Sequence, residues 1–303
     1  MGYGGVTDNQ GTSLETITWA TGLLAQTQRV TIFGTVHVPL FHPLIAAKQM
    51  VTADHVARGR FGLNIVAGWN EDEFRMFGVS QKDHDARYEY AQEWVDIVKA
   101  TWERDDFDYD GEFFHLKGVR QKPKPYGGTR PIIMNAGQTP VGRAFATRNT
   151  DMYFTAKHAK LDIQPIVDEV KLVKAAAHEG GREMEVFTAV HIVCRPTREE
   201  AEAYVRHAID ENADWGALEK ILAVRARTVT DPADLQKLRA DLPRVALGVA
   251  LIGTPDDVAQ ALGRYSDAGI RGVGMTFVNF VDELPYFCDE VLPRLERTGH
   301  RVP

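Results

Sequence analysis

Residues 30–70 read VTIFGTVHVPLFHPLIAAKQMVTADHVARGRFGLNIVAGWN, and this stretch decides the fold class. Two apolar runs, at 30–38 and 61–68, flank a helix-like segment at 43–57. Both runs are apolar on both faces, as is typical of strands in a parallel sheet that helices cover. The order strand, helix, strand therefore predicts a right-handed βαβ unit.

The same alternation continues along the chain. Further strand-like runs lie at 130–137, 151–156, 186–194 and 272–280, with a weaker run near 247–252. Helix-like segments occupy 13–27, 84–103, 139–149, 162–179, 198–223, 256–268 and 283–296, and capping residues mark two of the helix starts, at Thr197 and Thr254. The repeated order is compatible with a closed (β/α)8 barrel or an open doubly wound sheet, of which we favour the barrel.

Two segments interrupt this order. Residues 104–129 are rich in turn formers and aromatic residues and indicate a hairpin-like excursion, whereas residues 208–246 form a long, polar, helical stretch. Insertions in a barrel gather over its catalytic face, where they can act as lids. We predict a single α/β domain over residues 1–303 that carries these two insertions.

Composition excludes several classes of function. The 35 Lys and Arg residues against 42 Asp and Glu residues give a net charge of −7, which argues against a nucleic-acid partner. Cys194 and Cys288 are far apart and lack metal-ligand spacing, so we expect neither a disulfide framework nor a metal site. The start of the chain does not read as a signal peptide, and no apolar run approaches the roughly 20 residues that span a bilayer. We expect a cytoplasmic protein without a membrane partner.

The common catalytic motifs are missing from the chain: there is no GxGxxG, GxxxxGK[ST], HExxH or GxSxG. Polar residues gather instead at the carboxyl ends of the predicted strands. They are Thr35, His37 and Asn64, followed by Asn135 and Gln138 after the third run. Active-site residues of a barrel belong at these strand ends.

Each of the first three residues also has a structural interpretation. A histidine at the end of an apolar strand, such as His37, is more often a hydrogen-bonded structural residue than a catalytic one. Thr35 is of a type that strands favour. Asn64 is different, because an amide between Leu63 and Ile65 costs free energy if it is buried without a partner, so we expect it to serve a ligand or a neighbouring backbone group.

Three further segments have two interpretations each. GWNEDEFRMFG (68–78) is either a polar loop with an aromatic anchor or part of a site. Arg87, near the start of the next helix, is either a surface arginine or a phosphate ligand acting with the helix N-terminus. AGQTP (136–140) forms a strand-to-helix junction that exposes backbone N–H groups to an anion, although many α/β proteins have such a junction with nothing bound.

Taken together, the chain resembles the FMN-dependent monooxygenase branch of the bacterial-luciferase-like superfamily. The resemblance covers nearly the whole chain and is carried by residues 13–78 and by ARYEYAQEWVDIVKATWE (86–103), DGEFFHLKG (110–118), PIIMNAGQT (131–139) and GTPDDVAQALGRYSDAGIRGVGMTFVNF (253–280). Within the superfamily it is most similar to pyrimidine oxygenases, dimethylsulfone monooxygenases and alkanesulfonate monooxygenases.

This resemblance implies a (β/α)8 barrel that binds FMN at its C-terminal face. Reduced FMN would come from a separate flavin reductase and would act with O2 on a small organic substrate such as an alkanesulfonate, a sulfone or a pyrimidine. Barrels of this kind usually bury helix faces between subunits, so we expect a homodimer or homotetramer.

The resemblance also implies roles for individual residues. The flavin contacts it suggests are Asn64 at the ring edge with Glu73 nearby, Arg87 and Tyr88 toward the phosphate end, and Gly137, Gln138 and Thr139 at the phosphate-binding turn. Thr35 with Asn64 is similar to the oxygen-handling pair of pyrimidine oxygenases. His37 stands where several sulfur-oxidising relatives have an active-site histidine, which favours a sulfur-type or unassigned substrate. Hydrogen-bond donors at these three positions are suited to stabilising charge that develops on oxygen.

The chain departs from the family at its start. Family members begin with a strand, a helix and a second strand before the segment that here follows Met1, so we expect the first strand and helix of the barrel to be missing. Two other functions stay open on the same fold: a deazaflavin-dependent hydride-transfer enzyme and a non-catalytic flavin-binding barrel. Positive charge for a sulfonate is available from four residues that also read as solvated surface residues: Arg143, Arg148, Lys157 and Arg225.

Overall fold

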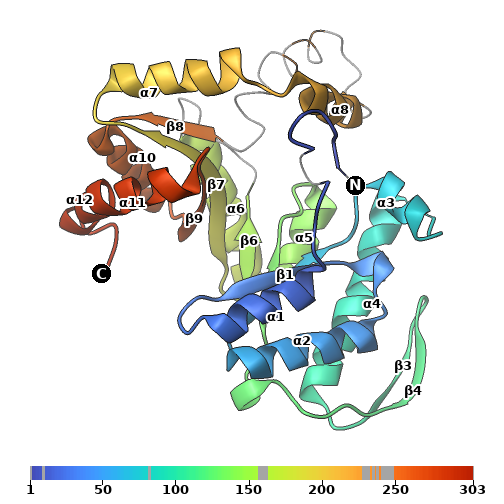
Figure 1. Cartoon of the computed structure of the whole chain (residues 1–303). Coiled ribbons are helices and arrows are strands. Elements are labelled where there is room, and N and C mark those ends of the chain that lie inside the picture. The colour runs from blue at the N-terminus through green and yellow to red at the C-terminus, as the bar shows by residue number, and fades with distance from the viewer. Residues whose placement is uncertain are drawn as a thin grey trace. The chain divides into compact units, whose positions relative to one another are not determined.

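The computed structural model describes residues 2–8, 11–80, 83–155, 163–226, 233, 236, 239 and 249–302 (Figure 1). The chain divides into two compact units. The first unit comprises Leu14–Phe154 and Val173–Glu185, and the second comprises Met1–Ser13, Thr155–Leu172 and Val186–Pro303. The single domain over residues 1–303 stays a prediction.

The first unit is built on a parallel sheet with the strand order β1-β2-β5-β6. Its strands are β1 (Ile32–His37), β2 (Phe61–Val66), β5 (Ile132–Asn135) and β6 (Met152–Phe154). Four helices pack side by side along it in chain order: α1 (Thr16–Gln26), α2 (Pro43–Ala57), α4 (His84–Glu103) and α5 (Pro140–Asn149). The predicted helices at 43–57 and 84–103 have these same bounds, and the alternation of strands and helices is confirmed.

The hydrophobic core of the first unit lies between this sheet and its helices. Val36, Leu63 and Ile65 are fully buried and belong to the same cluster as Trp94 of α4. Successive side chains of a strand point to opposite faces of the sheet. The burial of Val36, Leu63 and Ile65 against the helices therefore places Thr35, His37 and Asn64 together on the other face.

Residues 68–78 contain a short helix, α3 (Glu71–Met76). The side chain of Asn70 caps it by accepting the backbone N–H of Asp72 over 3.2 Å, and Glu71, Asp72 and Glu73 stand in its first turn, where the helix dipole favours negative charge. Phe74 anchors the helix and is 1% exposed. The interpretation of this segment as only a polar loop is therefore wrong.

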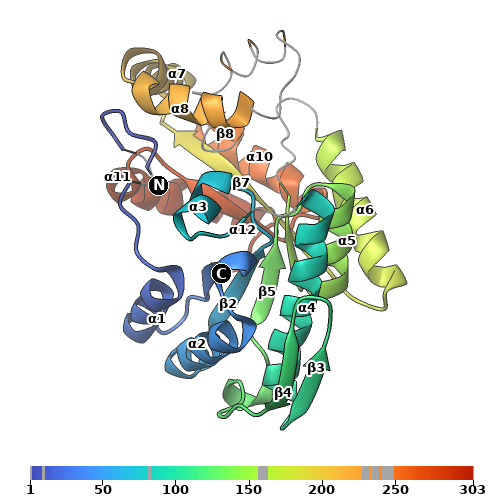
Figure 2. The ribbon, with the colours of Figure 1, turned by 90° about the vertical axis from the view of Figure 1, so that its right-hand side faces the viewer.

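An antiparallel hairpin of β3 (Phe107–Asp110) and β4 (His115–Val119) occupies the middle of residues 104–129 (Figure 2). The carboxylate of Glu93 on α4 accepts the backbone N–H groups of Glu112, Phe113 and Phe114 over 2.6, 3.0 and 3.2 Å. The tip of the hairpin is thereby attached to α4. Two short 3-10 helices, η1 (Val38–Leu40) and η2 (Tyr126–Gly128), complete the first unit.

The second unit has its own parallel strands, in the order β8-β7-β9. They are β7 (Glu185–Cys194), β8 (Val249–Gly253) and β9 (Gly272–Thr276). Its helical elements are α7 (Arg198–Val205), the π-helix η3 (Arg206–Glu211), α8 (Trp215–Ala226), α10 (Pro255–Asp267), α11 (Phe280–Glu290) and α12 (Leu292–Arg297). Helix α6 (Gln164–Glu179) begins in the second unit and ends in the first. The capping boxes at Thr197 and Thr254 are confirmed.

Two predicted helices are broken in the structure. Helix 198–223 divides into α7, η3 and α8, because the side chain of Asn212 donates to the carbonyl of His207 over 2.8 Å and Asp214 caps the start of α8. Helix 283–296 divides at Val291, where Pro293 in the first turn of α12 has no N–H to continue the earlier helix. Of the predicted insertion at 208–246, residues 227–232, 234, 235, 237, 238 and 240–246 lie outside the described residues. Within the described ranges, no helix combines the length and the apolar character needed to cross a membrane.

Candidate active site

Thr35 and Asn64 lie opposite each other on neighbouring strands, since Thr35 of β1 is in register with Asn64 of β2. Asn64 donates from Nδ2 to Oγ1 of Thr35 over 3.1 Å. Its Oδ1 is buried and has no hydrogen-bond partner. A buried acceptor without a partner costs free energy, so this oxygen marks a place where a ligand can donate a hydrogen bond.

His37 closes β1 two residues after Thr35, on the same face of the sheet. Its Nδ1 lies 3.2 Å from Oε2 of Glu73 on α3, and the two side chains are 24% and 29% exposed. The structure thus brings together His37 and Glu73, two residues that are far apart in the sequence, beside the Thr35–Asn64 pair.

The turn between β5 and α5 is built by glycines in close contact. A Cβ on Gly137 would lie 2.8 Å from Cα of Gly142 and 2.9 Å from Oδ1 of Asn135. The N–H of Gly137 donates to Asn135 Oδ1 over 2.8 Å, and Asn135 donates from Nδ2 to the carbonyl of Ile65 over 2.7 Å. Thr139 then caps α5 by accepting the N–H of Gly142 over 3.1 Å. The start of α5 is therefore held close to β2.

Tyr88 on α4 lies against this turn. Its ring packs on Phe145 with centroids 5.6 Å apart, and a Cβ on Gly142 would lie 2.6 Å from its hydroxyl oxygen. Burial raises the pKa of Tyr88, although its hydrogen bond with Thr139 and the charge of Arg87 oppose the shift. The phenol therefore stays protonated and can donate a hydrogen bond at the start of α5.

Arg87, the residue before Tyr88, contacts a different turn. Its Nη1 donates to the carbonyl oxygen of Gly68, two residues after the end of β2, and its Nε is buried without a hydrogen-bond partner. One side of the guanidinium thus holds the turn that leads into α3. The other carries a donor that a ligand such as a phosphate can satisfy.

The amide of Gln138 is engaged by the backbone, because Nε2 donates to the carbonyl oxygens of Ala136 and Phe154 over 3.0 and 3.1 Å. Arg143 donates to the carbonyl of Gln138 over 2.5 Å, and Arg148 is exposed. Lys157 and the side chain of Arg225 lie outside the described residues. Arg143 thus has a structural contact, and the cations considered for a sulfonate give no assembled anion site among the described residues.

The sequence that forms this site matches a known family. The profile of the family described as luciferase-like monooxygenase matches residues 2–272. The chain belongs to the luciferase-like monooxygenase family.

Two relatives show the range of activities near this member of the luciferase-like family. The FMNH(2)-dependent dimethylsulfone monooxygenase of Pseudomonas fluorescens (strain Pf0-1) is 30% identical over 92% of this chain and 77% of its own. The pyrimidine monooxygenase RutA of Enterobacter sp. (strain 638) is 28% identical over 99% of this chain and 83% of its own. The crystal structure of riboflavin lyase with modified FMN and riboflavin superposes with a TM-score of 0.85 at 23% identity, over 95% of this chain and 75% of that one. The last comparison shows that the luciferase-like α/β fold with parallel strands is shared.

The residues present fit a flavin, the cofactor named for the dimethylsulfone relative. A flavin ring edge carries N–H and carbonyl groups that can pair with the orphaned Oδ1 of Asn64 and its neighbours. The Gly137 turn leads into the N-terminus of α5, where backbone N–H groups and the helix dipole favour a phosphate. No group of three or more His, Cys, Asp or Glu side chains with metal-binding geometry occurs among the described residues.

Sequence reasoning missed some polar contacts in each of the two units. His84 lies with Nε2 3.3 Å from Oγ1 of Thr139 and packs on the ring of Tyr88, yet nothing in its local sequence indicates this. In the second unit, Nδ1 of His191 on β7 lies 3.1 Å from Oγ1 of Thr276 on β9. That pair had a signal, because His191 interrupts the apolar run at 186–194.

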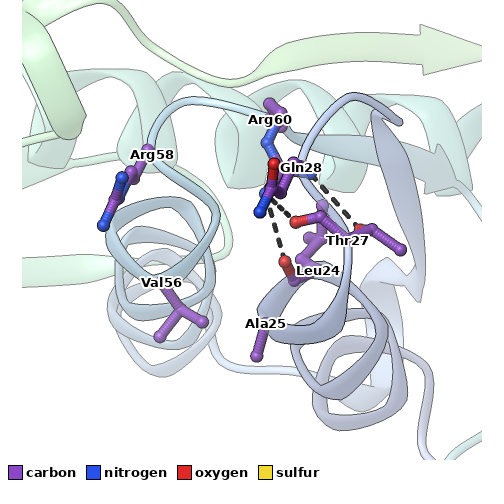
Figure 3. Close-up of a pocket in the computed structure, with 7 residues that line it drawn as sticks. All are labelled: Leu24, Ala25, Thr27, Gln28, Val56, Arg58 and Arg60. Carbon is purple, nitrogen blue, oxygen red and sulfur yellow. Dashed lines mark hydrogen bonds between the residues drawn. The ribbon is translucent and has the colours of Figure 1, made fainter.

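A cavity of about 570 Å³ lies at the opposite ends of the strands (Figure 3). Figure 3 shows the guanidinium of Arg60 turned toward the end of α1, where it donates to the carbonyl oxygens of Leu24 and Thr27 over 3.1 and 2.8 Å. Arg60 directly precedes β2, and its carbonyl accepts the N–H of Ile32 at the start of β1. The amino ends of barrel strands serve stability, so this cavity is separate from the candidate site.

Proposed function

We propose that this protein is a flavin-dependent monooxygenase that uses reduced FMN and O2 to oxygenate a small organic substrate. The observation that carries the proposal is the Thr35–Asn64 pair, which offers a hydroxyl and an unpartnered amide oxygen on the sheet face opposite the helices. The activities of the dimethylsulfone and pyrimidine relatives support it. We also propose that the parallel strands belong to a (β/α)8-type barrel.

In this proposal the residues divide into two groups. Reduced flavin, when bound, supplies the electrons that activate O2. Asn64 accepts a hydrogen bond from the ring edge, while the turn at Gly137, Gln138 and Thr139 binds the phosphate with Arg87 and Tyr88 nearby. The hydroxyl of Thr35 stabilises negative charge that develops on oxygen as a hydrogen-bond donor, and His37 and Asn64 complete the catalytic group beside it.

The substrate class is proposed as a sulfone, alkanesulfonate or pyrimidine, the classes that the resemblance of the sequence suggests. A separate flavin reductase is proposed as the source of reduced FMN. We further propose a homodimer or homotetramer in the cytoplasm, which light scattering during size-exclusion chromatography tests directly. These statements go beyond the family membership.

Equilibrium binding tests the cofactor. The purified chain is titrated anaerobically with oxidised FMN, with chemically reduced FMN and with a reduced deazaflavin, and the dissociation constants are compared. Selective binding of reduced FMN, weakened at least tenfold in Asn64→Leu, is the expected result. Gln28→Ala, in the cavity of Figure 3, is the matched control and should bind as the wild type does.

The outcomes separate the alternatives. Preference for the deazaflavin would replace oxygenation by hydride transfer. Tight flavin binding without substrate-dependent O2 consumption, in a screen of sulfones, sulfonates and pyrimidines, would support a non-catalytic flavin-binding protein. Binding of neither cofactor would overturn the proposal.

A further inference from the structure

The contact between His37 and Glu73 differs in burial from the other histidine–carboxylate pairs of the described residues. Both side chains of this pair are less than one third exposed, at 24% and 29%. In the other pairs at least one partner is mostly in water; His207 and Glu211, for example, are 66% and 65% exposed. Exposed ion pairs contribute little free energy because water and salt screen them. The His37–Glu73 contact is the one least screened.

The backbone on each side of this contact is attached to α4. Trp94 donates from Nε1 to the carbonyl of Phe41 over 2.8 Å, which fixes the chain just after His37. Arg87 donates to the carbonyl of Gly68, which fixes the turn before α3. Phe74, the neighbour of Glu73, is buried and its carbonyl accepts the N–H of Val79 over 2.9 Å. The backbone segments that carry His37 and Glu73 are therefore both held by α4.

Glu73 is the acidic residue of α3 that pairs with the histidine. Asp72 pairs with Arg75 on the same short helix. Among the described residues, the carboxylate of Glu73 forms its ion-pair contact with His37. Glu73 and His37 therefore form a pair of one carboxylate with one imidazole.

A carboxylate beside one ring nitrogen selects the protonation state of the imidazole. A neutral imidazole carries one N–H, and a carboxylate can only accept hydrogen bonds. The proton is therefore favoured on Nδ1, the atom 3.2 Å from Glu73 Oε2, which leaves the lone pair on Nε2. His37 shares its sheet face with Thr35 and Asn64, so its imidazole lies on the same side of the sheet as that pair.

We propose that Glu73 is the positioning residue of His37, holding the imidazole as the Nδ1–H tautomer so that Nε2 accepts a proton at the reaction site. This assigns Glu73 to the histidine rather than to the flavin. The catalytic meaning of the assignment rests on the proposed function, whereas the tautomer itself is a property of the flavin-free chain.

Nitrogen-15 NMR of the histidine-labelled, flavin-free protein tests the tautomer. At a pH at which the rings are neutral, the shifts of the two ring nitrogens show which one carries the proton, and His37→Gln assigns the signals. We expect the Nδ1–H form in the wild type, a shift to mainly Nε2–H in Glu73→Ala, and an intermediate population in Glu73→Gln. An Nε2–H wild type, or an Nδ1–H form that persists in Glu73→Ala, would overturn the proposal.

A double-mutant cycle then tests the catalytic meaning. If the substrate screen yields activity, Glu73→Ala should lower kcat about 10²-fold, within the range for acid–base groups. In a His37→Gln background the same change should cost less than twofold, because the residues act as one unit. Asp267→Asn, which alters the pair with His300, is the matched control and should leave kcat unchanged. Equal losses in both backgrounds would show that Glu73 acts independently of His37.

The tautomer measurement and the flavin and activity measurements can give opposite results, so they test the two proposals separately. A chain that binds no flavin but shows the predicted tautomers keeps the Glu73–His37 assignment and loses the proposed monooxygenase. A chain that oxygenates its substrate with an unselected tautomer does the reverse. Circular dichroism of each variant shows that the fold is intact before either comparison is made.

Discussion

Asn64 donates its amide N–H to Thr35 across adjacent strands and leaves its own carbonyl oxygen buried without a partner. Because the hydroxyl of Thr35 accepts this bond, its own O–H is directed elsewhere as a donor. Two strands in register thus present one donor and one acceptor side by side. An arrangement set by strand register needs no reorganisation when a reaction begins, which is what electrostatic stabilisation of an oxygen anion requires.

Thr35→Val should therefore reduce oxygenation more than stability. We expect kcat to fall about 10²-fold, the usual cost of removing one such donor. The unfolding free energy should fall by about 1–2 kcal/mol, because Nδ2 of Asn64 loses its acceptor. Substrate oxygenated per O2 consumed and a urea unfolding curve measure the two effects. Thr21→Val, which removes a helix hydroxyl bonded to the Ile17 carbonyl in α1, should affect stability alone; a comparable loss of kcat there would contradict the assignment.

The strand ends of this site were predictable because burial follows a period of two residues. Leu63 and Ile65 had to face a core, so Asn64 between them had to face away from it. The helix at 43–57 was equally accessible, since Pro43 suits the first helical turn and Gly59, with a φ of +83°, follows its end. Local geometry alone decides both features.

The contact between His37 and Glu73 was not accessible in the same way. It depends on α3, whose six residues are too few for helical periodicity to be recognised. It also depends on the attachment of Arg87 to Gly68, which joins segments 19 residues apart. The break between α7 and α8 was missed for a related reason, because a side chain of the helix itself, Asn212, ends the hydrogen-bond pattern. Tertiary contacts decide these features.

Gly137→Ala should weaken the binding of FMN. The added Cβ would lie 2.8 Å from the backbone of Gly142, so α5 must move away from the turn. We expect a stability loss of about 1–3 kcal/mol from the overpacking and at least a tenfold increase in the dissociation constant for FMN. Gly22→Ala in α1 meets nothing within 4 Å and should stabilise the helix by about 0.5–1 kcal/mol without changing FMN affinity. Unchanged FMN affinity in Gly137→Ala would remove this turn from the proposed phosphate site.

The two cysteines should react very differently with a thiol reagent. Burial raises the pKa of Cys194 to about 11, and its side chain is 4% exposed at the end of β7. Cys288 on α11 is exposed. Since the thiolate is the reactive form, one equivalent of dithionitrobenzoate should be consumed by the native protein and two by the unfolded protein. Cys288→Ser should abolish the native reaction, and fast labelling of Cys194 would contradict the burial of β7.

Lys99 should make stability depend on alkaline pH. Burial lowers the pKa of its amine from an ordinary 10.5 to about 8, helped by the charges of Arg130 and Arg182, while Asp96 and Asp151 oppose the shift. Below about pH 8 the amine is charged in both the folded and the unfolded chain, so the folded state bears the full cost of holding it. Between about pH 8 and 10.5 the unfolded chain binds more protons than the folded one, and stability rises with pH.

Lys99→Met removes this cost and provides the test. At pH 7 the variant should be more stable than the wild type by about 1–2 kcal/mol, a value reduced from the full shift because the amine is partly in water and also bonds Asn149. The advantage should shrink steadily toward pH 10.5, as urea unfolding at several pH values will measure. Lys171→Met, on the exposed face of α6, controls for the loss of one positive charge. An advantage of Lys99→Met that does not change with pH would mean that the amine is charged in the folded protein throughout this range.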